Sequence, residues 1–168
     1  GIYAKDLILN IINQLGVKAG VGYAYEFAGP AINALSMEER MTICNMSIEG
    51  GARCGYINPD EKTFNYMKDK LCSPQNENWD KAVKWWKSLA SSDDCIYDDV
   101  FKLDASKVEP TITWGITPGQ SIGINQKIPS LKEIHPNDQF IAGEAYEYMG
   151  FRPGQSIKNT PIDVCFIG

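Results

Sequence analysis

The chain has 168 residues, of which 43% are hydrophobic, and a formal net charge of −5 at pH 7. This length favours one domain, alone or with an appendage, and the hydrophobic content is enough for a buried core. The negative charge argues against nucleic-acid backbones and anionic lipids as main partners, and no apolar run approaches the ~18 residues of a membrane span.

The cysteine and histidine content limits the metal and redox chemistry that the chain can carry. Five cysteines are irregularly spaced without any Cys-x-x-Cys pair, and His135 is the only histidine. An odd number of scattered cysteines fits a reduced, cytoplasmic chain better than a disulfide framework. A histidine-based zinc site, or a nucleophile activated by histidine, therefore has little material. The five cysteines are Cys44, Cys54, Cys72, Cys95 and Cys165.

In the first third of the chain, the apolar pattern predicts a helix followed by a compact strand–helix–strand unit. Apolar residues recur at spacings of three and four in the first helix, whereas the strands show alternation and aromatic residues. The expected elements are a helix over 4–15, a strand over 21–27, a turn at 29–30, a helix over 36–51 and a strand over 53–57.

The helix over 36–51 has recognisable ends. Ser36 followed by Glu39 forms a capping box that begins it, and two glycines at 50–51 end it. Apolar residues at spacings of three and four form a stripe along this helix, which predicts that the stripe is buried. The stripe consists of Met37, Met41, Cys44 and Ile48.

Asn45 and Glu49 lie four residues apart on that helix, at the edge of the apolar stripe. Glu49 would occupy the last helical turn, where the helix dipole disfavours negative charge, so a half-buried carboxylate there would be protonated more easily than a free one. We therefore take the pair as candidate catalytic residues that present polar groups to a hydroxyl or a metal-bound water. The alternative is that both face solvent from an ordinary helix.

The remaining elements continue the alternation, which predicts an α/β sandwich with a mixed, mostly parallel sheet flanked by helices. Asp60 is expected to cap the helix that follows it. The expected elements are helices over 60–70, 79–90 and 138–149 and strands over 97–103, 111–114 and 161–168, the last of them buried. We expect three segments: a core over 1–114, a long connecting loop over 115–136, and a helix and strand over 137–168.

The segment 115–136 holds three prolines, three glycines and no clear periodicity apart from a brief apolar alternation at Ile122 and Ile124. A structureless run of roughly 20 residues inside a small domain is more often functional or interfacial than accidental. We therefore expect this loop to serve a contact or a site.

Lysine and tryptophan residues interleave over 79–87, a composition that can bind single-stranded nucleic acid. We favour instead an amphipathic helix with its tryptophans inward and its lysines in water, because the whole chain is acidic. Four aspartates around Cys95 lack the spacing of a calcium loop and indicate a charged turn.

Four stretches of the chain resemble the aconitase superfamily, in the same order and across essentially its whole length. They are LSMEERMTICNMSIEGGARCGYINPDEKTFNYMK over 35–68, GIYAKDLILNII at the start, TWGITPGQ over 113–120 and IDVCFIG at the end. Thr-Trp-Gly with Pro-Gly-Gln is similar to the large subunits of isopropylmalate isomerases, also called 3-isopropylmalate dehydratases, rather than to aconitase itself.

The resemblance implies a hydro-lyase that moves a hydroxyl group between adjacent carbons, converting 2-isopropylmalate to 3-isopropylmalate in leucine biosynthesis. It implies a [4Fe–4S] cluster, held in the full-length protein by three cysteines, whose open iron acts as a Lewis acid. In the family pattern Asn-Met-x-x-Glu, the asparagine and glutamate face that iron, which carries these roles to Asn45 and Glu49. Glu49 would hydrogen-bond the iron-bound water or the leaving hydroxyl, and Asn45 would help hold the cluster end of the site. A separate small subunit and a small hydroxy-dicarboxylic acid are the implied partner and substrate.

The chain departs from the family pattern at the cluster ligands. In the family, a Ser-Cys-Thr-Asn motif follows the final Ile-Gly and supplies the first ligand, and none of the five cysteines here matches a ligand position. We therefore expect a middle fragment of a large subunit that by itself binds no cluster and is inactive. Two alternatives stay open: a related hydro-lyase acting on homocitrate, citrate or citramalate-derived acids, and a non-catalytic interaction module of the same fold.

Overall fold

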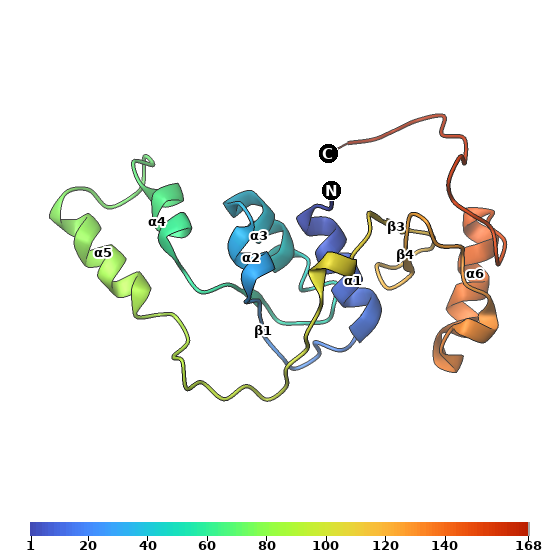
Figure 1. Cartoon of the computed structure of the whole chain (residues 1–168), viewed down its shortest axis with the longest axis horizontal. Helices are drawn as coiled ribbons and strands as arrows, with labels where there is room; N and C mark the ends of the chain where they lie inside the picture. Colours follow the sequence, from blue (N-terminus) through green and yellow to red (C-terminus); the bar gives the residue numbers. More distant parts are fainter. Residues whose placement is uncertain (168) are drawn as a thin grey trace. The chain divides into compact units, whose positions relative to one another are not determined.

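The computed structural model describes residues 1–167 (Figure 1). Helices alternate with short strands, which confirms the α/β class expected from the sequence. Contacts divide the chain into two compact units: Gly1–Val17 together with the chain from Ser106 onward form unit 1, and Lys18–Ala105 form unit 2. The predicted division at 114 and 136 stays a prediction. No helix in the described part of the chain is long and apolar enough to cross a membrane.

Unit 1 is built on one N-terminal helix, a β-hairpin and one later helix. The Asn13 amide donates to the carbonyl oxygens of Gly119 (2.8 Å) and Ser121 (3.0 Å), and the Asp6 carboxylate accepts from the Thr111 amide (2.7 Å). These bonds fasten the first helix to both strands of the hairpin. The elements are α1 (Ala4–Leu15), the antiparallel strands β3 (Thr111–Thr113) and β4 (Ser121–Gly123), the 3₁₀ turns η2 (Leu131–Glu133) and η3 (Pro136–Asp138), and α6 (Gln139–Met149).

A hydrophobic cluster joins the hairpin of unit 1 to α6. The Trp114 and Tyr146 rings stack with centroids 5.1 Å apart, and the Tyr146 hydroxyl donates to the Pro129 carbonyl at 2.6 Å. Gly150 ends α6 in the left-handed conformation (φ 69), as a C-terminal glycine is expected to do. The buried members of the cluster are Trp114, Ile128, Ala142, Ala145, Tyr146 and Ile157.

Unit 2 contains the predicted strand–helix–strand arrangement. Its two short strands pair in parallel, with Tyr25 opposite Gly55, and the chain between them forms two helices, since parallel neighbours need a crossover connection. The elements are β1 (Tyr25–Glu26), α2 (Pro30–Ala34), α3 (Met37–Asn45), β2 (Gly55–Tyr56), α4 (Glu61–Met67) and α5 (Glu77–Lys87), followed by the 3₁₀ turn η1 (Ala105–Lys107), where the chain passes into unit 1.

Helix α3 begins as predicted but ends earlier and buries another face. The capping box is present, with the Glu39 amide donating to Ser36 Oγ and the Ser36 amide to the Glu39 carboxylate. The helix ends at Asn45, and turns occupy 46–51, so the predicted extent is wrong. The predicted stripe is also wrong, because Met41 is 46% and Ile48 is 64% exposed. The residues that α3 and the following turn bury are Arg40, Ile43 and Ser47.

Helices α4 and α5 pack through aromatic rings. Asp60 caps α4 as predicted, by accepting from the Thr63 amide. The Trp86 ring stacks on Phe64 with centroids 6.2 Å apart. Trp85 is 61% exposed, so the expectation that the tryptophans of α5 all point inward is wrong for this residue.

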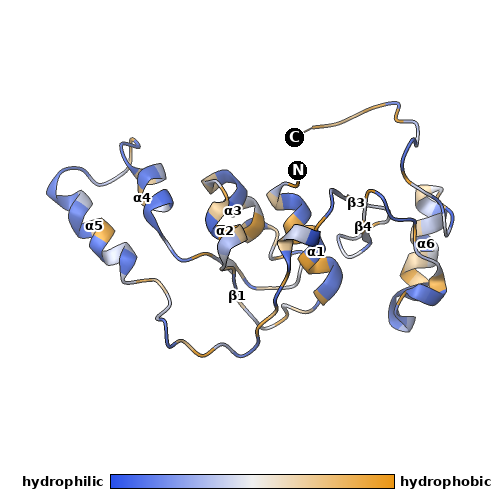
Figure 2. Ribbon diagram, viewed as in Figure 1, coloured by the Kyte–Doolittle hydropathy of each residue, from blue (hydrophilic) through white to orange (hydrophobic). Residues whose placement is uncertain are grey.

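Four other expectations differ from the structure. The segment 97–103 contains no strand, and the segment 161–167 is an extended chain, whose ribbon Figure 2 colours by hydropathy. The apolar side chains of 161–167 are exposed, among them Phe166 at 91%. The sequences of both segments have the apolar content or the apolar–polar alternation of strands, but within 1–167 neither segment pairs with a strand. Gly168, the last residue of the second predicted strand, lies outside the described residues. Strand β4 and the turn η2 lie inside 115–136, so this segment is not structureless. The predicted turn at 29–30 instead begins α2, with Pro30 at its first position.

Candidate functional site

The predicted site residues lie at the end of α3 and in the turn that follows it. Asn45 is the last residue of the helix, and Glu49 lies in the turn over 46–51. Both side chains are exposed, and neither has a hydrogen-bond or ion-pair partner within residues 1–167. Both polar groups are therefore open to solvent, the amide at the end of α3 and the carboxylate in the turn that follows it.

A buried serine within this turn makes hydrogen bonds to the end of α3 and to the residues that follow. Ser47 is fully buried, and its Oγ donates to the Ile43 carbonyl at 3.1 Å. Its own carbonyl oxygen accepts from the amides of Gly50 and Ala52, both at 3.1 Å. Because these bonds satisfy the backbone groups at the end of α3, the turn has a defined shape although its outer side chains are free.

Residues of β1 and of the chain before it are also hydrogen-bonded to this turn. The Gly20 amide donates to the Gly50 carbonyl at 2.9 Å, and the Tyr25 hydroxyl reaches the same oxygen at 3.3 Å. Two residues after the turn, the Arg53 amide donates to the Tyr23 carbonyl at 2.8 Å. The exposed pair is thus carried by backbone that is bonded on two sides.

Glu49 lies in a different environment from the one that the sequence predicted. The carboxylate lies beyond the end of α3 and is exposed, so the expectation that it is half-buried in the last helical turn is wrong. What this stretch offers chemically is an exposed carboxylate on Glu49, which accepts hydrogen bonds, and an exposed amide on Asn45, which both donates and accepts. A ligand hydroxyl or water can bind to such groups.

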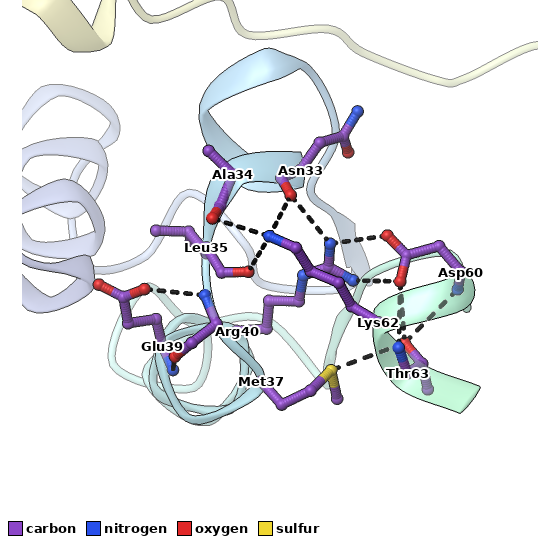
Figure 3. A network of polar contacts seen from close by, with 10 residues as sticks. Asn33, Ala34, Leu35, Met37, Glu39, Arg40, Asp60, Lys62 and Thr63 are labelled. Atoms are coloured by element: carbon purple, nitrogen blue, oxygen red, sulfur yellow. Dashed lines mark hydrogen bonds and ion pairs between the residues drawn. The ribbon is translucent and has the colours of Figure 1, made fainter. Parts of the chain in front are cut away.

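A second polar cluster, which sequence reasoning missed, surrounds Arg40 on α3 (Figure 3). Arg40 is only 3% exposed, and its guanidinium makes a bidentate ion pair with the Asp60 carboxylate at 2.8 and 2.7 Å. It also donates to the Asn33 carbonyl of α2 at 3.3 Å. The spacing of Arg40 with Ile43 and Ser47 follows the helical period, so the sequence did contain an indication that this face is buried.

Lys62 completes this cluster by satisfying the end of α2. Its Nζ donates to the carbonyl oxygens of Asn33, Ala34 and Leu35 at 2.8–2.9 Å (Figure 3). The hydrogen bond from Arg40 lowers the pKa of Asp60 to about 2. Since the members bond mainly to one another, we interpret the cluster as a structural lock between α2, α3 and α4.

A third cluster is centred on the Glu26 carboxylate of β1. It accepts from the Asn58 amide (3.1 Å), the Tyr97 hydroxyl (2.8 Å) and the Ser91 hydroxyl (2.5 Å). The Ser91 amide in turn donates to Asn58 Oδ1 at 3.0 Å. The bond to Glu26 raises the pKa of Tyr97. Both carboxylate oxygens are already occupied, so this cluster pins the chain after α5 to the sheet of unit 2.

Comparisons with known proteins identify the family. The profile of the Aconitase family (aconitate hydratase) matches residues 1–168. The chain belongs to the aconitase family. This aconitase-family chain is 91% identical, over all 168 residues, to the 3-isopropylmalate dehydratase large subunit of Prochlorococcus marinus subsp. pastoris. It is 87% and 64% identical over the same length to proteins of that name from P. marinus strain MIT 9515 and Synechocystis sp.. The chain spans 36% of the length of each of these relatives.

The residues of this aconitase-family chain do not fit an iron–sulfur cluster. Cluster iron is held by several cysteine thiolates together, but four of the five cysteines are exposed and no group of three possible metal ligands occurs within 1–167. Burial raises the pKa of the remaining one, Cys44, which disfavours the thiolate that a metal needs.

Proposed function

We propose that these residues are part of the large subunit of an isopropylmalate isomerase (3-isopropylmalate dehydratase). The full-length enzyme is a hydro-lyase that converts 2-isopropylmalate to 3-isopropylmalate by dehydration and rehydration in leucine biosynthesis. Its substrate is a small hydroxy-dicarboxylic acid, its partner is a small subunit, and it works in the cytoplasm. The high identity to proteins of that name over the whole chain supports the reaction, and five free cysteines fit a reducing compartment.

The observation that carries the proposal is the turn after α3. Dehydration takes a hydroxyl group from one carbon and a proton from the neighbouring carbon, and the departing oxygen must itself gain a proton; rehydration reverses these steps and takes a proton from the entering water. Glu49 can hold and return this proton because its carboxylate is exposed and has no partner within 1–167. Asn45, at the start of the same turn, can orient the reacting oxygen by donating its amide hydrogen.

The aconitase family implies a [4Fe–4S] cluster in the full-length enzyme, where it would supply Lewis-acid chemistry. Its ligands would come from residues other than the ones described here, because these do not assemble a ligand set. Glu49 and Asn45 are assigned only their contacts with the reacting oxygen.

The test is turnover of 2-isopropylmalate by the full-length large subunit assembled with its small subunit. Glu49→Gln keeps the shape of the side chain but cannot take up a proton, so kcat should fall by about 10²–10⁴-fold, the usual contribution of a general acid–base group. Asn45→Ala should lower kcat by a smaller factor. Glu38→Gln, at an exposed glutamate within α3, is the matched control and should leave kcat unchanged.

Normal turnover in both site variants would contradict the proposal and favour a non-catalytic module. Loss of turnover in the Glu38→Gln control as well would also count against it, because the effect would then not be specific to the turn. Assays on homocitrate, citrate and citramalate in parallel decide the substrate, since 2-isopropylmalate should give the highest kcat/KM.

A further inference from the structure

Two glycines allow an unusually close approach of backbone to the turn that carries Asn45 and Glu49. At Gly55, the first residue of β2, an added Cβ would overlap Ser47 Oγ. It would also lie 2.6 Å from the Cα of Cys44 and 2.7 Å from the Cys44 carbonyl oxygen. Cys44 is the residue before Asn45, so β2 touches the backbone of α3 directly beneath the site.

Gly20 makes the corresponding approach from the other side. An added Cβ there would lie 2.5 Å from the Ala52 amide nitrogen and 2.8 Å from its Cα. It would also lie 2.8 Å from the Tyr25 hydroxyl, which bonds the Gly50 carbonyl. Ala52 itself is buried, so these backbone atoms have no room to retreat.

We propose that Gly20 and Gly55 are positioning residues, which act as a two-sided clamp that sets where Asn45 and Glu49 stand relative to the substrate. Neither glycine contacts the substrate; each acts through the backbone of the turn over 45–52. This inference rests on the proposed function, because it assumes that Asn45 and Glu49 contact the reacting oxygen.

The clamp matters because proton transfer depends steeply on distance. Misplacement of a catalytic group by about 1 Å can cost on the order of 10²-fold in rate. At both glycines the atoms that an added methyl group would meet include backbone, which gives way only if the turn itself moves. A side-chain neighbour at the end of a flexible chain would simply rotate aside.

The experiment uses Gly20→Ala and Gly55→Ala in the full-length, assembled enzyme. Each should lower kcat by about 10–100-fold while KM stays within about twofold, since the effect falls on orientation of the reacting group rather than on binding. Gly143→Ala in α6 is the control, because an added Cβ there meets nothing within 4 Å, and it should leave kcat unchanged. Amide hydrogen exchange of the peptide covering 46–52 should speed up in the two clamp variants and not in the control.

Combined variants separate positioning from general damage. If Gly55 acts through Asn45 and Glu49, adding Gly55→Ala to a background with both Asn45→Ala and Glu49→Gln should cost little further kcat, since both groups that it positions are already disabled. An equal loss in both backgrounds would overturn the clamp. Should Gly55→Ala fail to fold, Tyr25→Phe carries the test, because it removes only the hydroxyl that holds the Gly50 carbonyl and should lower kcat about threefold.

The kcat values of these variants test the clamp and the proposed function separately. Normal turnover in Glu49→Gln rejects the proposed function, whatever the glycine variants do. Loss of turnover in Glu49→Gln with wild-type kcat in Gly20→Ala, Gly55→Ala and Tyr25→Phe rejects the clamp and leaves the proposed function standing.

Discussion

Arg40 and Glu49 belong to the same short stretch of sequence, but the structure treats their charges in opposite ways. Arg40 is 3% exposed, and its guanidinium is bonded to Asp60 and to the end of α2. Glu49 is exposed and has no partner within 1–167. A buried charge destabilises a fold unless it is paired, whereas an exposed one has almost no effect on stability. The Arg40 charge is therefore paired and stabilises the fold, whereas the Glu49 charge is unpaired within 1–167 and available to a ligand.

The comparison predicts that removing Arg40 has the largest effect on stability. Arg40→Met in the 168-residue chain should lower the free energy of unfolding by about 3 kcal/mol, near the low end for a broken buried pair because Asp60 is 42% exposed. Urea unfolding followed by tryptophan fluorescence measures this, since Trp86 stacks on Phe64 of α4 in the same unit.

The matched control is the double variant Arg40→Met with Asp60→Asn, which leaves no charge unpaired and keeps a capping side chain on α4. It should be less destabilised than Arg40→Met alone. A loss below about 1 kcal/mol in Arg40→Met would show that the cluster is not the lock inferred here.

The second prediction concerns how the Arg40–Asp60 ion pair contributes to stability at low pH. Arg40 lowers the pKa of Asp60 from 3.8 to about 2 in the folded chain. Because folding favours the ionised form, the contribution of Asp60 is complete above about pH 4 and is lost as the pH falls toward 2. The full shift corresponds to about 2.5 kcal/mol; partial exposure of Asp60 reduces this to about 1 kcal/mol through solvent screening.

Unfolding of the chain and of its Asp60→Asn variant at pH 6, 4 and 3 isolates this contribution from other carboxylates. The difference in stability between the two should shrink below about pH 4. A difference that stays constant over this range would contradict the assigned shift.

The third prediction tests the N-terminal cap of α3, which the sequence predicted correctly. Ser36→Ala removes the side chain that accepts from the Glu39 amide, and should lower the free energy of unfolding by about 0.5–1 kcal/mol. Ser36→Asn, which keeps a capping oxygen, should restore most of it. An Asn variant as unstable as the Ala variant would argue against the cap.

The smallest expected effect completes the comparison. Glu49→Gln should change the free energy of unfolding by less than about 0.5 kcal/mol, because an exposed side chain without partners contributes little. The same urea experiment measures it. A loss comparable to that of Arg40→Met would mean that Glu49 serves the fold, and the contrast between the two charges would disappear.

Local rules predicted the elements whose cause is local. The helix Ala4–Leu15, its end at Gly16, the caps at Ser36 and Asp60 and the end of α6 at Gly150 all agree with the structure. These features depend on side chains within about four residues of each other, which a sequence displays directly.

The errors arose where distant residues decide. The apolar spacing over 37–48 indicated one buried face, but Asp60 and the carbonyl of Asn33 draw Arg40 inward, so α3 turns a different face to the core. The extended segments at 97–103 and 161–167 have strand-like sequences, but a strand forms only where another strand supplies hydrogen-bond partners.

The sequence by itself determined the family, the two residues proposed to act on the substrate, and the local signals that begin helices at Ser36 and Asp60 and end them at Gly16 and Gly150. Only the tertiary structure decided that α3 ends at Asn45 and that the turn after it is clamped between Gly20 and Gly55. The physical reason is range: caps and helical spacing act over a few neighbouring residues, whereas burial, ion pairing and close backbone approach depend on residues that only folding brings together.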